Sequence, residues 1–279
     1  MTSVNGHRAD ATTLTGVSET ALLTLRARAN EARRPDPLID DPIAVKLMDS
    51  IDYDFSKFGP ARRQDVALRA RAFDINAHRY LAAHPGATVV ALAEGLQTSF
   101  WRLDAVDSSH KFRWLTVDLP PIIELRRRLL PRSPRTLVRA QSALDFSWMD
   151  AVDPADGVFI TAEGLLMYLQ PDEALGLIAE CAGRFGGGQM MFDLPPPWIP
   201  ALTRRGFRTS LRYKAPPMPF SLTVAEIADL VHRVPGIRAV HDMPLPRGRG
   251  PVFSLMLWTL QRLPMFDAIR PALTLLEFG

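Results

Sequence analysis

The stretch that decides the fold of this 279-residue chain is VVALAEGLQTSFWRLD, residues 89–104. An apolar run of strand character ends in a short turn that carries Gly95, and a segment of helical character follows it. In open α/β sheets, this first strand-to-helix turn is where a nucleotide-like ligand meets the backbone. The sequence therefore predicts an α/β sheet with a ligand site at this turn.

A second apolar run, residues 112–117, ends in Asp118. A carboxylate at the tip of the second strand suits the hydroxyl pair of a ribose. A dinucleotide site normally needs the glycines of G-x-G-x-x-G, because the pyrophosphate must approach bare backbone. The corresponding positions here are Ala93, Gly95 and Thr98, so only one glycine is present. The pattern favours S-adenosylmethionine, which has no pyrophosphate, over a nicotinamide cofactor.

Composition indicates an ordinary globular protein. The chain is long enough to bury a sizeable core, and its 47% hydrophobic and 23% charged residues are typical values. No apolar run reaches the length of a membrane span, and residues 1–15 lack the apolar centre of a secretory signal. The single cysteine, Cys181, excludes an internal disulfide framework and a zinc cluster built on cysteines. We therefore expect a cytoplasmic protein without a membrane partner.

The net charge of +3 raises the question of nucleic-acid binding, because arginines gather within residues 126–139. Residues 121–130 predict a helix whose buried side Leu125, Leu129 and Leu130 supply, so that the arginines fall largely on a solvated face. No aromatic-rich basic groove accompanies them. We expect no nucleic-acid partner.

The first 85 residues are mainly helical by pattern, with apolar positions at 3–4 spacing in residues 21–29 and 66–81. Strands then alternate with helices. The predicted strands are residues 88–93, 112–117, 136–139, 157–161 and 189–193, and the predicted helices are 96–106, 121–130 and 171–185. This alternation implies right-handed crossovers and a parallel sheet.

A segment rich in proline, residues 195–219, follows the fifth strand. Long excursions of this kind run over the surface and are either lids or plain connections. A helix begins next, with Thr223 or Ser221 as N-cap, and extends to His232. The apolar stretches 237–240 and 252–258 are expected to close the sheet as an antiparallel edge hairpin.

Five blocks of the sequence together resemble one family, that of the leucine carboxyl methyltransferases and the tetracenomycin-type polyketide O-methyltransferases. The blocks are residues 33–42, 69–74, 89–104, 116–120 and 160–169. The resemblance implies a Rossmann-like, class I fold that uses S-adenosylmethionine, with a mostly parallel sheet. It also implies a helical N-terminal cap over residues 1–85 and a core over residues 86–279, with a substrate-covering lid inserted at about 195–220.

The resemblance further implies which residues hold the cofactor. We expect them to be Arg28, Arg69, Ala93, Glu94, Gly95, Asp118, Leu119, Ala143, Leu144 and Glu163. Arg69 would pair with the methionyl carboxylate, since a guanidinium offers a bidentate fork, and Arg28 would be a second contact. Asp118 would accept the ribose hydroxyls, although a strand-end aspartate also caps the turn that follows it. Glu163 would face the ammonium group.

Three positions depart from the family pattern. Ala93 stands where a glycine is usual, and Gln97 and Ala143 stand where aspartates are common. These departures favour an alternative, a catalytically silent protein that keeps the fold and the cofactor. The retained glycine, aspartate, arginine and glutamate of the cofactor site argue against that alternative.

No catalytic base can be identified from the sequence. A carboxylate acceptor needs none because it is already anionic at neutral pH, whereas a phenol would profit from a base. The histidine candidates are His78, His110, His232 and His241. No histidine spacing supports a metal site.

The resemblance implies O-methylation of a carboxyl or phenolic hydroxyl on a small aromatic or polyketide-like molecule. Tyr168, Trp198 and Tyr213 are the candidate substrate contacts. Methylation of a protein C-terminal carboxylate is a further alternative. Both a monomer and a homodimer are compatible with the sequence.

Overall fold

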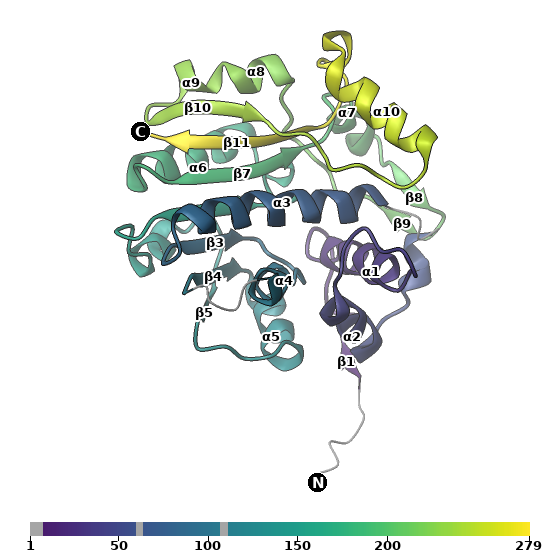
Figure 1. The fold of residues 1–279 in the computed structure, drawn as a ribbon. Coiled ribbons are helices and arrows are strands. Elements are labelled where there is room, and N and C mark those ends of the chain that lie inside the picture. The colour runs from purple at the N-terminus through teal and green to yellow at the C-terminus, as the bar shows by residue number, and fades with distance from the viewer. Residues whose placement is uncertain (1–7, 60–63, 107–110) are drawn as a thin grey trace.

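A seven-stranded sheet organises the computed structural model, which describes residues 8–59, 64–106 and 111–279 (Figure 1). The strand order is β10-β11-β7-β6-β3-β4-β5. Its strands are β3 (Thr88–Leu92), β4 (Arg113–Asp118), β5 (Thr136–Ala140), β6 (Val158–Ala162), β7 (Gln189–Leu194), β10 (Ile237–Asp242) and β11 (Ala272–Phe278). Strands β3 to β7 pair in parallel, and β11 pairs antiparallel with both β7 and β10. The predicted α/β class and the mostly parallel sheet are confirmed.

Helices and short strands surround this sheet. The helices are α1 (Thr20–Ala32), α2 (Pro42–Ser50), α3 (Gln64–Ala83), α4 (Ser99–Val106), α5 (Pro120–Leu129), α6 (Pro171–Arg184), α7 (Ile199–Arg204), α8 (Val224–Ala228), α9 (Leu230–Arg233) and α10 (Pro251–Arg262). Four 3-10 turns, at Phe55–Phe58, Phe146–Ala151, Leu166–Tyr168 and Pro264–Phe266, complete the helical elements. The short strand pairs are β1 (Ala9–Asp10) with β2 (Ile51–Asp52) and β8 (Arg208–Ser210) with β9 (Tyr213–Lys214).

Strand β3 is buried on both faces, which explains its uninterrupted apolar sequence. Val90 packs in one cluster with Leu177 of α6, whereas Val89 packs in another with Phe73 of α3. Helix α3 crosses one face of the sheet in Figure 1, so the helical N-terminal part shares a core with the strands. The arrangement is three-layered, with helices on both faces of the sheet.

The expected edge hairpin is wrong in its second strand. Residues 252–258 lie in helix α10, and the partner of β10 is β11, which begins only after that helix, at Ala272. A short apolar run does not by itself distinguish a strand from a helix, and here Pro251 occupies the first helical position. The antiparallel pair at the sheet edge is nevertheless present.

The helix expected from Thr223 to His232 is two short helices, α8 and α9, which meet at Asp229. Thr223 is the N-cap of α8, and its side chain forms a capping box with Glu226. The proline-rich segment contains α7, β8 and β9.

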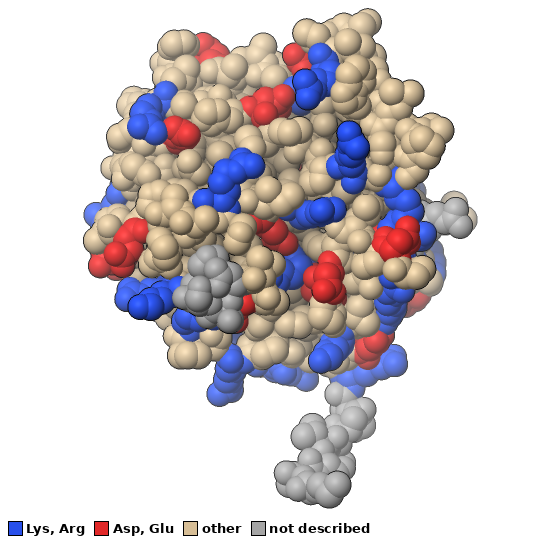
Figure 2. All heavy atoms as spheres, viewed as in Figure 1, with Lys and Arg blue, Asp and Glu red and all other residues tan. Residues whose placement is uncertain are grey.

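Acidic and basic side chains alternate over the face drawn in Figure 2, so that face carries no broad area of one sign. Among the described residues, no helix has the length and apolar content needed to cross a membrane.

Candidate functional site

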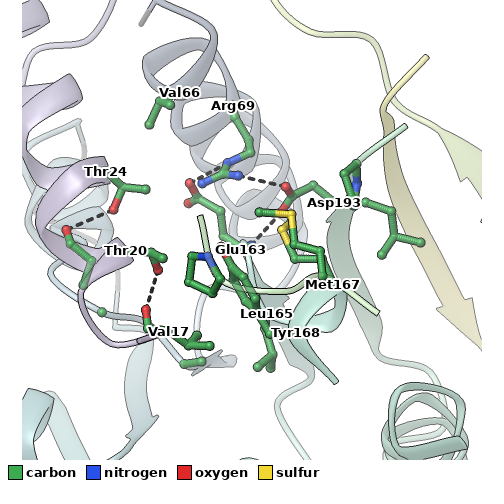
Figure 3. Close-up of a pocket in the computed structure, with 18 of the residues that line it drawn as sticks. Val17, Thr20, Thr24, Val66, Arg69, Glu163, Leu165, Met167, Tyr168 and Asp193 are labelled. Carbon is green, nitrogen blue, oxygen red and sulfur yellow. Dashed lines mark hydrogen bonds and ion pairs between the residues drawn. The ribbon is translucent and has the colours of Figure 1, made fainter. Parts of the chain in front are cut away.

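A cavity of about 620 Å³ opens where the parallel strands end. Its walls come from the turns after β3, β4, β6 and β7 and from helices α1, α3, α7 and α10, and Figure 3 shows part of this lining. The carboxyl ends of parallel strands are the usual ligand edge of an open α/β sheet. The lining is mainly apolar, with a few charged groups gathered beside the sheet.

The turn after β3 has an unusual backbone. Ala93 (φ 48°) and Gly95 (φ 59°) both adopt left-handed conformations, which an L side chain resists. A Cβ atom at Gly95 would also lie 3.1 Å from the Cβ of Ala21 in helix α1. The turn therefore needs its glycine for two reasons, and it accepts Ala93 under some strain.

Asp118 ties this turn to the end of β4. The backbone N–H of Gly95 donates to Oδ2 (2.6 Å), and the N–H of Leu119 donates to Oδ1 (2.7 Å). Each oxygen keeps a further lone pair for a ligand hydroxyl. Burial raises the pKa of this carboxyl to about 6, against the lowering effect of the two backbone hydrogen bonds.

A partly buried ion cluster also lines the cavity (Figure 3). Arg69, from helix α3, donates through Nε to Glu163 (3.0 Å) and through Nη1 to Asp193 (2.9 Å). Burial lowers the pKa of the guanidinium, but the two carboxylates outweigh that effect and the net direction is upward. Among the described residues no hydrogen bond occupies Nη2, so this nitrogen remains for a carboxylate ligand.

Gln97 joins the same cluster. Its amide nitrogen donates to Oε2 of Glu163 (2.7 Å), and its amide oxygen lies 3.4 Å from Nη2 of Arg102. An aspartate at this position would place a second negative charge against Glu163. The glutamine thus has a local structural role that fits this site, and its presence does not indicate a damaged cofactor turn.

Asp193 is a site residue that the sequence analysis missed. It is the penultimate residue of β7, lines the cavity, and accepts a hydrogen bond from the backbone N–H of Gly164 through Oδ1 (2.7 Å). Burial raises its pKa, although Arg69 opposes that rise. A signal was available, because the predicted fifth strand ended at this aspartate and thus at the ligand edge of the sheet.

Glu94 belongs to the turn after β3, yet its side chain makes its contacts inside the protein. One oxygen accepts from Oγ1 of Thr116 (2.5 Å) and pairs with Nη2 of Arg126 (2.8 Å). Arg126 also donates to the backbone carbonyl of Gly95 (2.8 Å). These bonds fix the turn from behind.

Most of the expected cofactor residues lie together. Those that line the cavity are Arg69, Ala93, Glu94, Gly95, Asp118, Leu119, Ala143, Leu144 and Glu163. Arg28 is not among the lining residues. It is fully buried, where it pairs with Asp41 (3.3 Å) and donates to the carbonyl of Leu96 (2.6 Å). Arg28 therefore contacts the turn after β3 from the protein interior and not from the cavity.

The expected substrate contacts divide in the same way. Tyr168 and Tyr213 line the cavity. Trp198 is half exposed on the outside, where its Nε1 donates to the carbonyl of Ile269 (3.2 Å). Helix α10, which sequence reasoning took for a strand, adds Leu257 and Leu260 to the wall.

No histidine among the described residues lines the cavity. His110 lies outside the described residues, and His232 and His241 belong to α9 and β10 at the sheet edge. Within the described ranges no group of three or more potential ligands is arranged for a metal ion.

The residues present fit S-adenosylmethionine. The left-handed glycine leaves room beside the turn, Asp118 has free lone pairs at a ribose position, and Arg69 with Glu163 offers both charges that an amino-acid group needs. Fold and site together define a class I, S-adenosylmethionine-dependent methyltransferase. Residues 21–182 match the model of the leucine carboxyl methyltransferase family, and the chain belongs to that family.

Two relatives illustrate the relationship. The tetracenomycin polyketide synthesis O-methyltransferase TcmP of Streptomyces glaucescens is 37% identical over 227 residues, which cover 81% of this chain and 82% of that protein. The S-adenosyl-L-methionine-dependent methyltransferase dpfgK of Gibberella zeae is 32% identical over 66% of this chain and 67% of its own length.

Solved structures share the fold at low sequence identity. A DUF574 family protein from Streptomyces avermitilis superposes with a TM-score of 0.57 at 14% identity, covering 93% of this chain and 97% of that one. A Thermobifida fusca structure gives a TM-score of 0.53 at 18% identity and covers 92% and 94% of the two chains.

Proposed function

We propose that this methyltransferase transfers a methyl group to an oxygen of a small aromatic or polyketide-like acceptor, at a carboxyl or a phenolic hydroxyl. The observation that carries the proposal is the cavity itself. Its volume of about 620 Å³ and its mainly apolar lining suit a cofactor together with a flat, apolar acceptor. The O-methyltransferase TcmP, named for tetracenomycin polyketide synthesis, supports the same acceptor class.

S-adenosylmethionine, when bound, supplies a methyl group already activated on a sulfonium, so the chain mainly has to bind and orient. Asp118 would hold the ribose hydroxyls. Arg69 would hold the methionyl carboxylate through Nη2, while Glu163 would accept from the ammonium group. Asp118 ends β4, Glu163 directly follows β6 and Arg69 lies on α3, so regular elements of the fold hold all three side chains, which suits the positioning of two reactants.

No histidine among the described residues lines the cavity, which supports an acceptor that arrives already ionised. A carboxylate is already ionised at neutral pH. A phenol is ionised in part if substituents on its ring lower its pKa toward neutrality. The two tyrosines of the wall, Tyr168 and Tyr213, would contact the acceptor. Burial raises the pKa of both phenols, so they would act as neutral hydrogen-bonding groups.

Residues 195–220 would cover the acceptor as a lid. Ten residues of this segment line the cavity: Pro195, Pro196, Ile199, Thr203, Phe207, Thr209, Tyr213, Ala215, Pro216 and Met218. The cytoplasm is the proposed compartment, supported by the single cysteine, which is buried.

The test uses labelled S-adenosylmethionine with a panel of aromatic acids and phenols, such as 2-naphthoate, anthraquinone-2-carboxylate and 2-naphthol. Mild base then cleaves a methyl ester but leaves a methyl ether intact. Label in the base-labile fraction indicates carboxyl transfer, and label in the stable fraction indicates phenol transfer. Binding of S-adenosylmethionine with no transfer to any acceptor would support the silent-protein alternative.

Calorimetry separates the cofactor from the acceptor question. We expect wild-type protein to bind S-adenosylmethionine with micromolar affinity, on the order of −8 kcal/mol, and NADH not at all. Asp118→Ala should abolish binding. Wild-type protein that binds neither compound would contradict the proposed function.

A further inference from the structure

Helix α10 is apolar on two opposite sides. One side carries Leu257 and Leu260, which line the cavity. Helical periodicity places a second apolar stripe, led by Val252 and Leu255, on the other side. An amphipathic surface helix normally keeps its outer side polar, so this second stripe calls for an explanation.

The second stripe lies open to solvent. Val252 is 81% exposed, Leu255 63% and Trp258 56%, and not one residue of α10 is buried. Eight large apolar residues in and around α10 are at least 40% exposed, and we name them together the outer α10 surface. They are Val252, Leu255, Met256, Trp258, Leu263, Met265, Ile269 and Trp198. A hydrogen bond from Nε1 of Trp198 to the carbonyl of Ile269 (3.2 Å) brings these two members together.

Charge is nearly absent from this surface. The chain has no acidic residue between Asp242 and Asp267, and Arg262 is the single ionic residue between Gly250 and Phe266. The upper right of Figure 2, over α10, is accordingly mostly tan. The core of a protein–protein interface is typically rich in tryptophan, methionine and arginine and poor in acidic residues and lysine, and this surface has the same composition.

The size of the surface also fits a protein partner. Eight half-exposed large side chains offer about 100 Å² each, which amounts to roughly 800 Å², the area that one partner contributes to a standard interface. The largest apolar patch of a typical monomer is about 300–600 Å². The outer α10 surface therefore exceeds what a monomer usually leaves open.

We propose that a second copy of this chain covers the outer α10 surface in a two-fold symmetric dimer. Two antiparallel α10 helices would place Val252 of one copy opposite Leu263 of the other. Arg262 would then face the apolar half of the partner helix instead of the second Arg262, so no like charges meet. Because the inner side of α10 lines the cavity, this contact would also hold one wall of the acceptor site.

The experiment measures molar mass by size-exclusion chromatography with light scattering, at about 1 to 50 µM protein. Wild-type protein should elute at twice the monomer mass. The double variant Leu255→Glu/Trp258→Glu should elute as a folded monomer with an unchanged far-UV circular dichroism spectrum, since both side chains are exposed in the single chain. Val106→Glu, a matched change at a 70% exposed valine at the end of α4, should remain a dimer.

A wild-type monomer at 50 µM would overturn the proposal, and so would a dimer that survives in the α10 variant. The milder variant Met256→Lys should also shift the mass toward the monomer, which keeps the test valid if the double variant unfolds. A flotation assay with vesicles of phosphatidylcholine and phosphatidylglycerol tests whether a lipid surface covers α10 instead. A monomer that floats with these vesicles through α10 would replace the second copy with a lipid surface.

Discussion

At the scale of single residues, we expect the carboxylate of Asp118 to make cofactor binding dependent on pH. Its pKa, raised to about 6 by burial, leaves a growing fraction of neutral acid as the pH falls below neutrality. We expect affinity for S-adenosylhomocysteine to fall about tenfold between pH 7 and pH 5, as roughly one in ten carboxyls remains ionised. Calorimetry across this range measures it. The same slope in Asp118→Asn would assign the effect to another group.

Folding responds to this carboxyl in the opposite sense. Because the folded-state pKa lies above the ordinary value, the folded protein binds the proton more tightly than the unfolded chain does. The contribution of Asp118 to stability is therefore complete below pH 4 and is lost as the pH rises through about 6. The cofactor-free protein thus favours the protonated form of Asp118, whereas the proposed ribose contact would favour the ionised form.

Gly95 gives a second prediction at this scale. Gly95→Ala should cost about 1–2 kcal/mol of stability, because an L residue resists the left-handed conformation. The new methyl group would also press against Ala21, 3.1 Å away, and move helix α1 at the cavity wall. Urea denaturation and cofactor titration together measure both effects. Gly183→Ala, where a Cβ has open space inside α6, is the control and should leave cofactor affinity unchanged.

From the sequence, the candidate site residues could be proposed more readily than the side chains that contact them. The resemblance proposed Arg69, Asp118 and Glu163 because each lies in a motif, and all three line the cavity. It could not show that Gln97 supports Glu163, because that contact joins positions 66 residues apart in the chain. Arg28 was expected as a second contact to the methionyl carboxylate, but it is fully buried against Asp41 and does not line the cavity. Its place in the sequence gives no information on whether its side chain faces the cavity.

At the scale of elements, one buried aspartate joins three helices. Asp41 caps α2 through the N–H of Ala44 (3.0 Å), pairs with Arg28 of α1, and pairs with Nη1 of Arg102 of α4 (2.8 Å). Thr98, just before α4, donates to it as well. This carboxylate holds the N-terminal helices against the back of the cofactor turn.

Asp41→Asn should therefore be strongly destabilising. Two buried guanidinium groups would lose a full charge partner, and breaking a buried pair costs about 3–5 kcal/mol. Urea denaturation gives the free energy of unfolding. Asp49→Asn is the matched control, because Asp49 pairs with Arg33 at the exposed surface, where such a pair contributes less than about 1 kcal/mol. Equal losses in the two variants would show that Asp41 has no special role.

Helices and strands could be predicted where the hydrophobic pattern was long or where turn residues marked its ends. Strands β3 to β7 and helices α3 and α6 follow clear periods and turn signals. Helix α10 was not predictable as a helix, because its two apolar sides together remove the polar positions that would reveal a helical period. The missed strand β11 follows from the same error, since a hairpin partner had already been assigned.

At the scale of the whole molecule, the cavity joins both halves of the sheet with the N-terminal helices and α10. A ligand bound there should stabilise the protein as a unit. S-adenosylhomocysteine at a hundred times its Kd should add about 2.7 kcal/mol, which corresponds to a rise in Tm of roughly 5–10 °C. Differential scanning calorimetry measures it, with NADH as the control. An unchanged Tm would mean that the cavity does not bind this cofactor.

The position of β11 has a consequence for how the protein is made. This strand, near the end of the sequence, lies between β7 and β10 and hydrogen-bonds to both. During synthesis, β10 leaves the ribosome before β11, its neighbour in the sheet. Its backbone stays unpaired at that edge until residues 272–278 emerge and insert between β7 and β10. Long-range pairing of this kind is slow and exposes strand edges while it is incomplete. A nascent chain stalled before residue 272 should therefore depend on chaperones, although its cofactor turn is already complete.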